Sequence, residues 1–144
     1  MHPQFLVEIT LNAVRSKYRL TMPPAPEHGP VQLSAFVQAE GRLYISGMRG
    51  DSPETRHNAS AQTLESLQRL TRLLKRARFS WRELREILVY VSDISHAPSV
   101  MYELAPFLPV FRRPAGVIVE TGLLAPGSLV EIAGTFARDR WRWR

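Results

Sequence analysis

The order of hydrophobic patterns along the chain is the feature that most constrains its fold. From residue 33 onward, short runs rich in β-branched residues alternate with two segments that favour helices. Alternation at a spacing of two is typical of strands, and spacings of three and four are typical of helices. The predicted order is therefore strand, strand, helix, strand, helix, strand, strand.

A hairpin and an amphipathic helix open this order. LSAFVQ at 33–38 and RLYISG at 42–47 flank the turn AEG, in which Gly41 can take a positive φ. Leucines at spacings of three and four predict a helix over about 60–77, with Ser60 as its cap. The run EILVYVSD predicts a strand over 86–93.

The second half of the chain repeats these patterns. A second helix is expected to begin at about Pro98, because proline suits a first helical turn, and Pro106 should bend it or end it early. Two more strands are expected at 115–122 and 128–137. The whole predicts an α+β sandwich, a mixed sheet with both helices on one face. Since no further helix is available for the other face, we expect neighbouring subunits to bury it.

The 144 residues fit a single domain with flanking segments. MPPAPEHGP at 22–30 predicts an extended arm, so 1–32 is interpreted as an N-terminal extension with a proline-rich arm. Residues 1–21 are compatible with a short strand or a helix docked elsewhere. The domain itself is assigned to 33–137, and 138–144 is interpreted as a basic Arg/Trp tail.

Several classes of protein are excluded by what the sequence lacks. No apolar run approaches the length of a membrane span, and the N-terminal segment does not have the pattern of a signal peptide. The absence of cysteine excludes disulfides, thiolate metal sites and a cysteine nucleophile. No His/Asp/Glu cluster has metal-ligand spacing. We therefore expect a cytoplasmic protein without a metal or other cofactor.

The net charge of +6 raises the question of a nucleic-acid partner. Basic residues cluster in RLTRLLKRAR at 69–78 and in RDRWRWR at 138–144. Interleaved Arg and Trp could stack on bases and contact phosphates. A solvated helix face and a frayed tail are the simpler interpretation, which we prefer.

Five segments stand out along residues 33–137, and they read FVQAEGRLYISG, QTLESLQRLTRLLKRA, ILVYVSDIS, RPAGVIVE and LVEIAGTFA. In this order and spacing they resemble the Rid (YjgF-like) family. The resemblance implies a chorismate-mutase-like fold and a homotrimer with pockets between subunits. It also implies hydrolysis of reactive enamines and imines to a ketone and ammonia.

The resemblance also implies which residues form the site. The glutamate that positions the attacking water in the family falls on Glu131, and the SG turn beside it falls on Ser46–Gly47. Without the resemblance, Glu131 reads as a solvent-facing strand carboxylate. The tyrosine of many family pockets falls on Phe36, and the asparagine falls on Met101.

The family arginine that clamps a substrate carboxylate falls on Gly116. This chain therefore lacks the bidentate guanidinium fork at that position. Gly116 is interpreted as a lost anchor that also widens the pocket. The rival interpretation, a glycine needed only for close approach of strands, is weaker because Phe36 and Met101 have changed too. Val117 and Ile118 would form neighbouring pocket wall.

Other side chains could take part in the site. Arg112, Arg113 and Arg49 are candidates to replace the missing guanidinium, although each is more simply a rim charge. Arg49 is the first to test, because glycines on both sides would let its loop approach a ligand. Glu120 shares a strand face with Gly116 and is more simply structural, and His96 is more simply a helix cap.

These observations favour an enzyme, a Rid-like hydrolase with altered specificity. Glu131 would act as the acid/base on a small, largely apolar enamine, imine or enol-type metabolite, by water addition or proton transfer. Carboxylate-bearing substrates of the 2-aminoacrylate type should be poor, and a role in secondary metabolism would fit the changed pocket. The alternatives are a non-catalytic trimer that binds a small ligand and, supported only by charge, RNA binding or an endoribonuclease.

Overall fold

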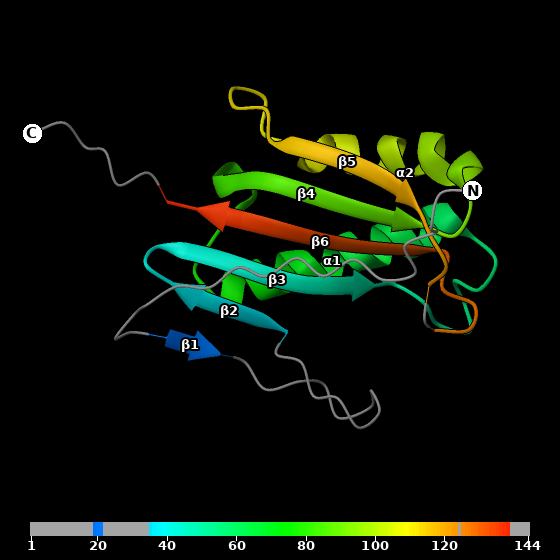
Figure 1. The fold of residues 1–144 in the computed structure, drawn as a ribbon, viewed down its shortest axis with the longest axis horizontal. Helices are drawn as coiled ribbons and strands as arrows, with labels where there is room; N and C mark the ends of the chain where they lie inside the picture. The colour runs from blue at the N-terminus through cyan, green and yellow to red at the C-terminus, as the bar shows by residue number, and fades with distance from the viewer. Residues whose placement is uncertain (1–18, 22–34, 124, 139–144) are drawn as a thin grey trace, which may run out of the picture.

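A computed structural model describes residues 19–21, 35–123 and 125–138. These residues form one mixed six-stranded sheet in the order β1-β2-β3-β6-β4-β5 (Figure 1). The strands are β1 (Arg19–Thr21), β2 (Phe36–Ala39), β3 (Arg42–Arg49), β4 (Leu84–Val91), β5 (Ala115–Glu120) and β6 (Val130–Ala137). Strands β4 and β5 pair in parallel, and the other neighbours are antiparallel.

Both described α-helices, α1 (Ala59–Arg76) and α2 (Ala97–Leu104), lie behind the same face of the sheet (Figure 1). The described residues also form the short 3₁₀ helices η1 (Trp81–Glu83), η2 (Ile94–His96) and η3 (Ala105–Phe107). The α+β fold with both helices on one face is therefore confirmed.

The core lies between α1 and the sheet, where alternate strand residues meet a leucine stripe. On β6 the residues from Val130 to Phe136 alternate strictly between buried and half-buried. On α1 the buried Leu67, Leu70 and Leu74 face them. Each such side chain contributes about 1.5–3 kcal/mol on burial, so this stripe holds α1 against the sheet.

The N-terminus of α1 differs from the sequence prediction. Asn58 is the N-cap, and its side-chain oxygen accepts a hydrogen bond from the backbone N–H of Ala61 at 3.0 Å. Ser60 lies inside the first turn, and its hydroxyl donates to Glu103 Oε1 at 2.5 Å. The prediction of Ser60 as the cap was wrong because the extended backbone of Asn58 places a capping group earlier in the chain.

The region around α2 confirms one expectation and corrects another. The helix ends at Leu104, and the segment containing Pro106 continues as η3, as expected for a proline that stops a helix. His96 occupies the N-cap position of α2, but its side chain makes no capping hydrogen bond. Instead, Asp93 Oδ1 accepts from Ser95 N at 2.8 Å and caps η2, so the capping role given to His96 was wrong.

The face opposite the helices, here called the open face, carries the other half of each strand. Tyr90 and Val119 are partners on it, as are Leu88 and Val117. None of the described helices lies over this face. Its burial by neighbouring subunits stays a prediction.

The sequence predictions for the flanks fall largely outside the described residues. This holds for the proline-rich arm at 22–30 and for the tail beyond Arg138. Of the first 21 residues, 19–21 form β1 and pair with β2. No described helix is long and apolar enough to cross a membrane.

Candidate functional site

The structure places Glu131 on the open face, near the middle of the sheet. It lies directly opposite Arg49 of β3 on one side and Tyr90 of β4 on the other. Directly opposed residues of antiparallel strands point to the same face, so the carboxylate stands between an arginine and a tyrosine. The three residues are half-buried. Arg49 and Tyr90 give the Glu131 carboxylate polar neighbours. Such neighbours suit a carboxylate that accepts and returns a proton.

The SG turn lies beside this carboxylate. The register of β3 against β6 shifts between Ile45 and Met48, so Ser46 and Gly47 form a bulge. A Cβ atom at Gly47 would lie 1.7 Å from Glu131 Oε1. The carboxylate therefore occupies the space that a side chain at 47 would need. The structure brings Glu131 together with Ser46 and Gly47, as the resemblance implied.

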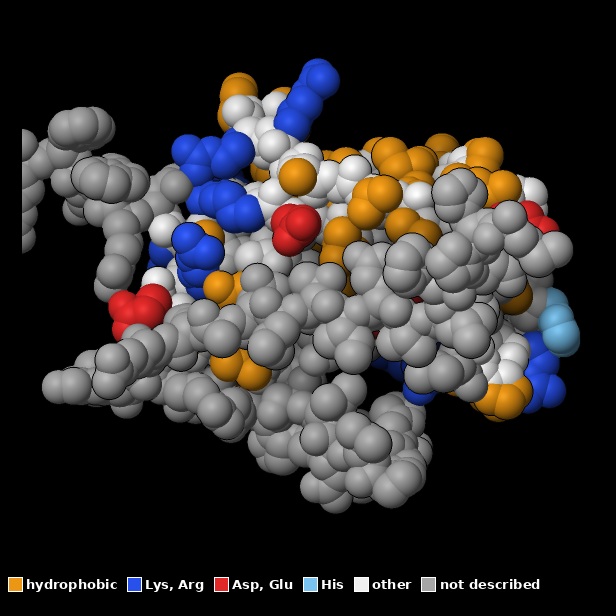
Figure 2. All heavy atoms as spheres, in the orientation of Figure 1, with side chains coloured by type: hydrophobic (Ala, Val, Ile, Leu, Met, Phe, Trp, Pro, Cys, Tyr) orange, Lys and Arg blue, Asp and Glu red, His pale blue; other side chains and the backbone are white. Residues whose placement is uncertain are grey.

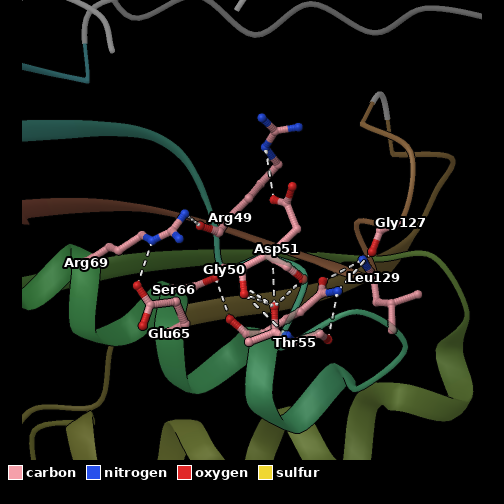
Figure 3. Close-up of polar contacts among 11 residues, drawn as sticks. Arg49, Gly50, Asp51, Thr55, Glu65, Ser66, Arg69, Gly127 and Leu129 are labelled. Carbon is pink, nitrogen blue, oxygen red and sulfur yellow. Dashed lines mark hydrogen bonds and ion pairs between the residues drawn. The ribbon is translucent and has the colours of Figure 1, made fainter. Parts of the chain in front are cut away.

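Arg49 is held by the protein itself. Its Nε lies 3.7 Å from Asp51 Oδ1, and its carbonyl oxygen accepts a hydrogen bond from Arg69 Nη1 at 2.7 Å (Figure 3). Gly50 packs on α1, where an added Cβ would lie 2.1 Å from the Gln62 carbonyl oxygen. Gly50 therefore allows close contact of this loop with α1.

The second group of predicted residues lines a cavity of about 520 Å³, here called the α2–β5 pocket. Met101, Gly116, Val117 and Ile118 all line it, together with Arg113. Hydrophobic side chains gather over α2 and β5 on the surface as well (Figure 2). The volume lies in the range of about 300–1,000 Å³ that is typical of small-molecule pockets.

Gly116 is a wall of this pocket. Its φ lies outside the left-handed region, so the backbone there does not demand glycine. A Cβ atom would lie 3.1 Å from Ile87 Cγ2, a tight but tolerable contact. The absence of a side chain at Gly116 leaves space in the pocket, and the tight contact with Ile87 also fits a glycine needed for close packing, so its interpretation as a lost anchor stays a prediction.

Glu131 and Gly116 do not share one site within the chain. Gly116 pairs with the buried Ile87 on the helix side of the sheet, whereas Glu131 lies on the open face. Phe36 is apart from both, because it is a core residue that is only 2% exposed. Glu120 Oε2 accepts a hydrogen bond from Ile94 N at 2.9 Å, which confirms its structural interpretation.

The basic cluster at 69–78 lies along the exposed side of α1. Arg69 and Arg72 both pair with Glu65 Oε1, at 2.8 and 3.2 Å, and Lys75 and Arg76 are exposed. The cluster is thus exposed on α1 and partly paired with Glu65, and its interpretation as a solvated helix face stays a prediction. Within the described parts of the chain, no three His, Asp or Glu side chains gather so that they could hold a metal ion.

The sequence did not indicate that Tyr90 lies beside Glu131, and it did not distinguish Arg113 from Arg112. Tyr90 joins Glu131 only through the register of β4 against β6, which no local pattern reveals. Arg112 and Arg113 are adjacent and both exposed, but only Arg113 lines the α2–β5 pocket. The alternation in EILVYV was the one available signal, since it places Tyr90 on the opposite face from Val89 and Val91.

Together the fold and the pocket define a small α+β protein with a mixed sheet, helices on one face and an apolar cavity at its edge strand. The family model described as Endoribonuclease L-PSP matches residues 25–137. The chain therefore belongs to this family, the Rid or YjgF-like proteins.

Individual relatives agree with this assignment. The chain is 29% identical over 115 residues to the 3-aminoacrylate deaminase RutC of Acinetobacter baylyi, covering 75% of this chain and 90% of RutC. A crystal structure of a YjgF/YER057c/UK114 family member from Mycobacterium tuberculosis matches with a TM-score of 0.74 at 27% identity, over 84% of this chain and 100% of that chain. A YjgF family member from Neisseria meningitidis matches with a TM-score of 0.73 at 25% identity, over 87% and 99%.

Proposed function

We propose that the protein is a Rid-like hydrolase that converts a small, largely apolar enamine or imine to a ketone and ammonia. The observation that carries this proposal is the contact of the Glu131 carboxylate with the Gly47 bulge, between Arg49 and Tyr90. A half-buried carboxylate beside exposed backbone groups suits the positioning of a water molecule and the removal of its proton.

In the proposed reaction, Glu131 accepts a proton from water while the water oxygen bonds to the C=N carbon and the nitrogen takes up a proton. The resulting carbinolamine then loses ammonia. Its C–N bond breaks, its hydroxyl gives up a proton, and a ketone remains. An enamine enters the same sequence after protonation at carbon gives the imine. Each step needs one group that accepts and returns a proton, which is the role assigned to Glu131.

We place the substrate between subunits. Within one chain, Glu131 lies on the open face, whereas Ile87 and Gly116, which line the α2–β5 pocket, lie on the helix side of the sheet. A second copy packed on the open face would present its own pocket edge to Glu131. Gly116 supplies no guanidinium and Met101 no amide, so a small acid of the 2-aminoacrylate type would find neither partner there.

The test is the substitution Glu131→Gln, which keeps shape and polarity and removes the base. Ammonia release from a panel of neutral imines of apolar ketones should fall by about 10²–10⁴-fold, the usual range for a general acid or base. Glu120→Gln is the matched control, because that side chain accepts a hydrogen bond from Ile94 N and should leave turnover unchanged. A Glu131→Gln variant that retains wild-type turnover would refute the acid/base role.

The apolar walls of the pocket also favour a second candidate, a trimer that binds a small ligand without converting it. In that case ligand binding would be measurable by calorimetry, no ammonia would be released, and Glu131→Gln would leave the affinity unchanged.

A further inference from the structure

We propose that the α2–β5 pocket selects amphipathic carboxylic acids, and that Arg113 holds their carboxylate at its mouth. This inference rests on the proposed function, in which the protein binds a small molecule, and it names the chemical class of that molecule. The carboxylate would bind well away from position 116, with an apolar body between it and the reacting carbon.

Charge is the first observation. Among the described residues that line the pocket, Arg113 is the only charged one, and the walls around it are almost entirely apolar, including Met101, Leu104 and Ile118. Apolar walls lower the local dielectric and focus the field of a single charge into a concave space. A pocket of this kind favours an anion that also has an apolar part.

Availability of the guanidinium is the second observation. Arg49 pairs with Asp51, Arg69 with Glu65 and Arg138 with Glu83.

Arg113, in contrast, forms no ion pair or hydrogen bond with any group in the described part of the chain. None of the described residues that line the pocket is acidic. The planar guanidinium presents a fork of donors that matches a carboxylate in a bidentate way. That fork is therefore open to a ligand.

Position is the third observation. Arg113 precedes Gly116 by three residues on the approach to β5, and a fully extended chain spans at most roughly 3.6 Å per residue, so their Cα atoms are at most about 11 Å apart. A two- or three-carbon acid held at Arg113 would leave the deeper apolar wall unfilled. An acid with a longer apolar body would fill both parts of the cavity of about 520 Å³.

The experiment is calorimetric titration of the full chain with hexanoate, hexanamide and acetate. Hexanoate should bind about tenfold or more tightly than hexanamide, because a charged hydrogen-bonded pair is added. It should also bind about tenfold or more tightly than acetate, because four methylene groups are buried.

Arg113→Gln should remove the preference for hexanoate over hexanamide and leave the affinity for hexanamide unchanged. Arg112→Gln is the matched control, since that neighbouring residue carries the same charge, is also exposed and does not line the pocket. The preference should persist in it. Thermal denaturation of both variants establishes that they are folded.

The inference is overturned if wild-type protein binds hexanoate and hexanamide equally, if it binds neither, or if Arg113→Gln retains the preference. The same titrations in Glu131→Gln separate this inference from the proposed function. An intact preference there, with or without turnover, supports the role of Arg113 whatever the fate of the acid/base role.

Discussion

Gly47 has no side chain, and this leaves room for the Glu131 carboxylate beside it. An added Cβ would lie 1.7 Å from Oε1. Because Oε1 is the far end of a flexible side chain, the carboxylate can rotate away while the strand stays in place. The glycine therefore fixes the position of the carboxylate more than it fixes the fold.

Gly47→Ala should lower turnover while reducing the free energy of unfolding by no more than about 1–3 kcal/mol, the usual cost of overpacking. Ammonia release and thermal denaturation measure the two effects. Gly122→Ala is the control, since an added Cβ there meets nothing within 4 Å. Unchanged turnover in Gly47→Ala would mean that the observed carboxylate position is not needed for catalysis.

Glu65 gives a prediction of pH dependence. The side-chain hydrogen bond from Arg69 lowers the pKa of Glu65 below its usual value. A carboxyl group with a lower pKa in the folded state stabilises the fold above its unfolded pKa of about 4.3, and this contribution is lost as the pH falls.

Glu65→Gln should therefore lower the free energy of unfolding by about 0.2–1 kcal/mol at neutral pH. The difference from wild type should shrink at about pH 3, below the unfolded pKa. Urea denaturation at the two pH values measures it, and Gln68→Ala on the same helix should show no such change with pH. A difference that grows on acidification would contradict the assigned direction.

At the scale of elements, one buried side chain ties α1 to the start of β6. Gln62 is 0% exposed, its Nε2 donates to the Gly127 carbonyl at 2.9 Å, and its Oε1 accepts from Leu129 N at 2.7 Å. Figure 3 shows Gly127 and Leu129 meeting the helix at this point. These two hydrogen bonds of Gln62 are here called the Gln62 clamp. Glu131 lies two residues after Leu129, so the clamp also helps to fix where β6 begins.

Gln62→Met keeps the approximate shape and leaves both backbone groups without their partner. Each unsatisfied buried group costs about 1–3 kcal/mol, so the free energy of unfolding should fall by about 2–5 kcal/mol. Urea denaturation measures this loss. Gln68→Met, on the exposed side of the same helix, should be nearly neutral. Equal effects of the two substitutions would show that the clamp contributes little.

At the scale of the whole molecule, the open face exposes apolar residues that no described helix covers. Val117 and Val119 are 47% and 39% exposed. Strand residues of this kind are commonly buried by another copy of the chain. Burial of this face would also explain why Glu131 and the α2–β5 pocket are separated within one chain.

We expect a homotrimer in solution, and Val119→Arg should shift it toward monomer. Light scattering across micromolar concentrations measures the mass. Leu64→Arg is the matched control, because Leu64 has the same 39% exposure but lies on α1. A wild-type protein that is monomeric throughout this range would contradict both the assembly and the pocket between subunits.

Local patterns in the sequence determined the elements and the turn between β2 and β3. The leucine spacing predicted a helix over 60–77, and α1 spans 59–76. Gly41 has the positive φ expected of it, at 72°. Helical and strand periodicity and turn chemistry depend on neighbours along the chain, so a single sequence carries them.

Only the tertiary structure decided which side chains meet. The insertion of β6 between β3 and β4 places Tyr90 and Arg49 on either side of Glu131, and the bulge at Gly47 makes room for its carboxylate. The register of β5 against β4 puts Gly116 on the other face, beside the buried Ile87. Sheet order and register depend on packing between residues far apart in the chain, and a one-residue shift would turn every side chain of a strand to the opposite face.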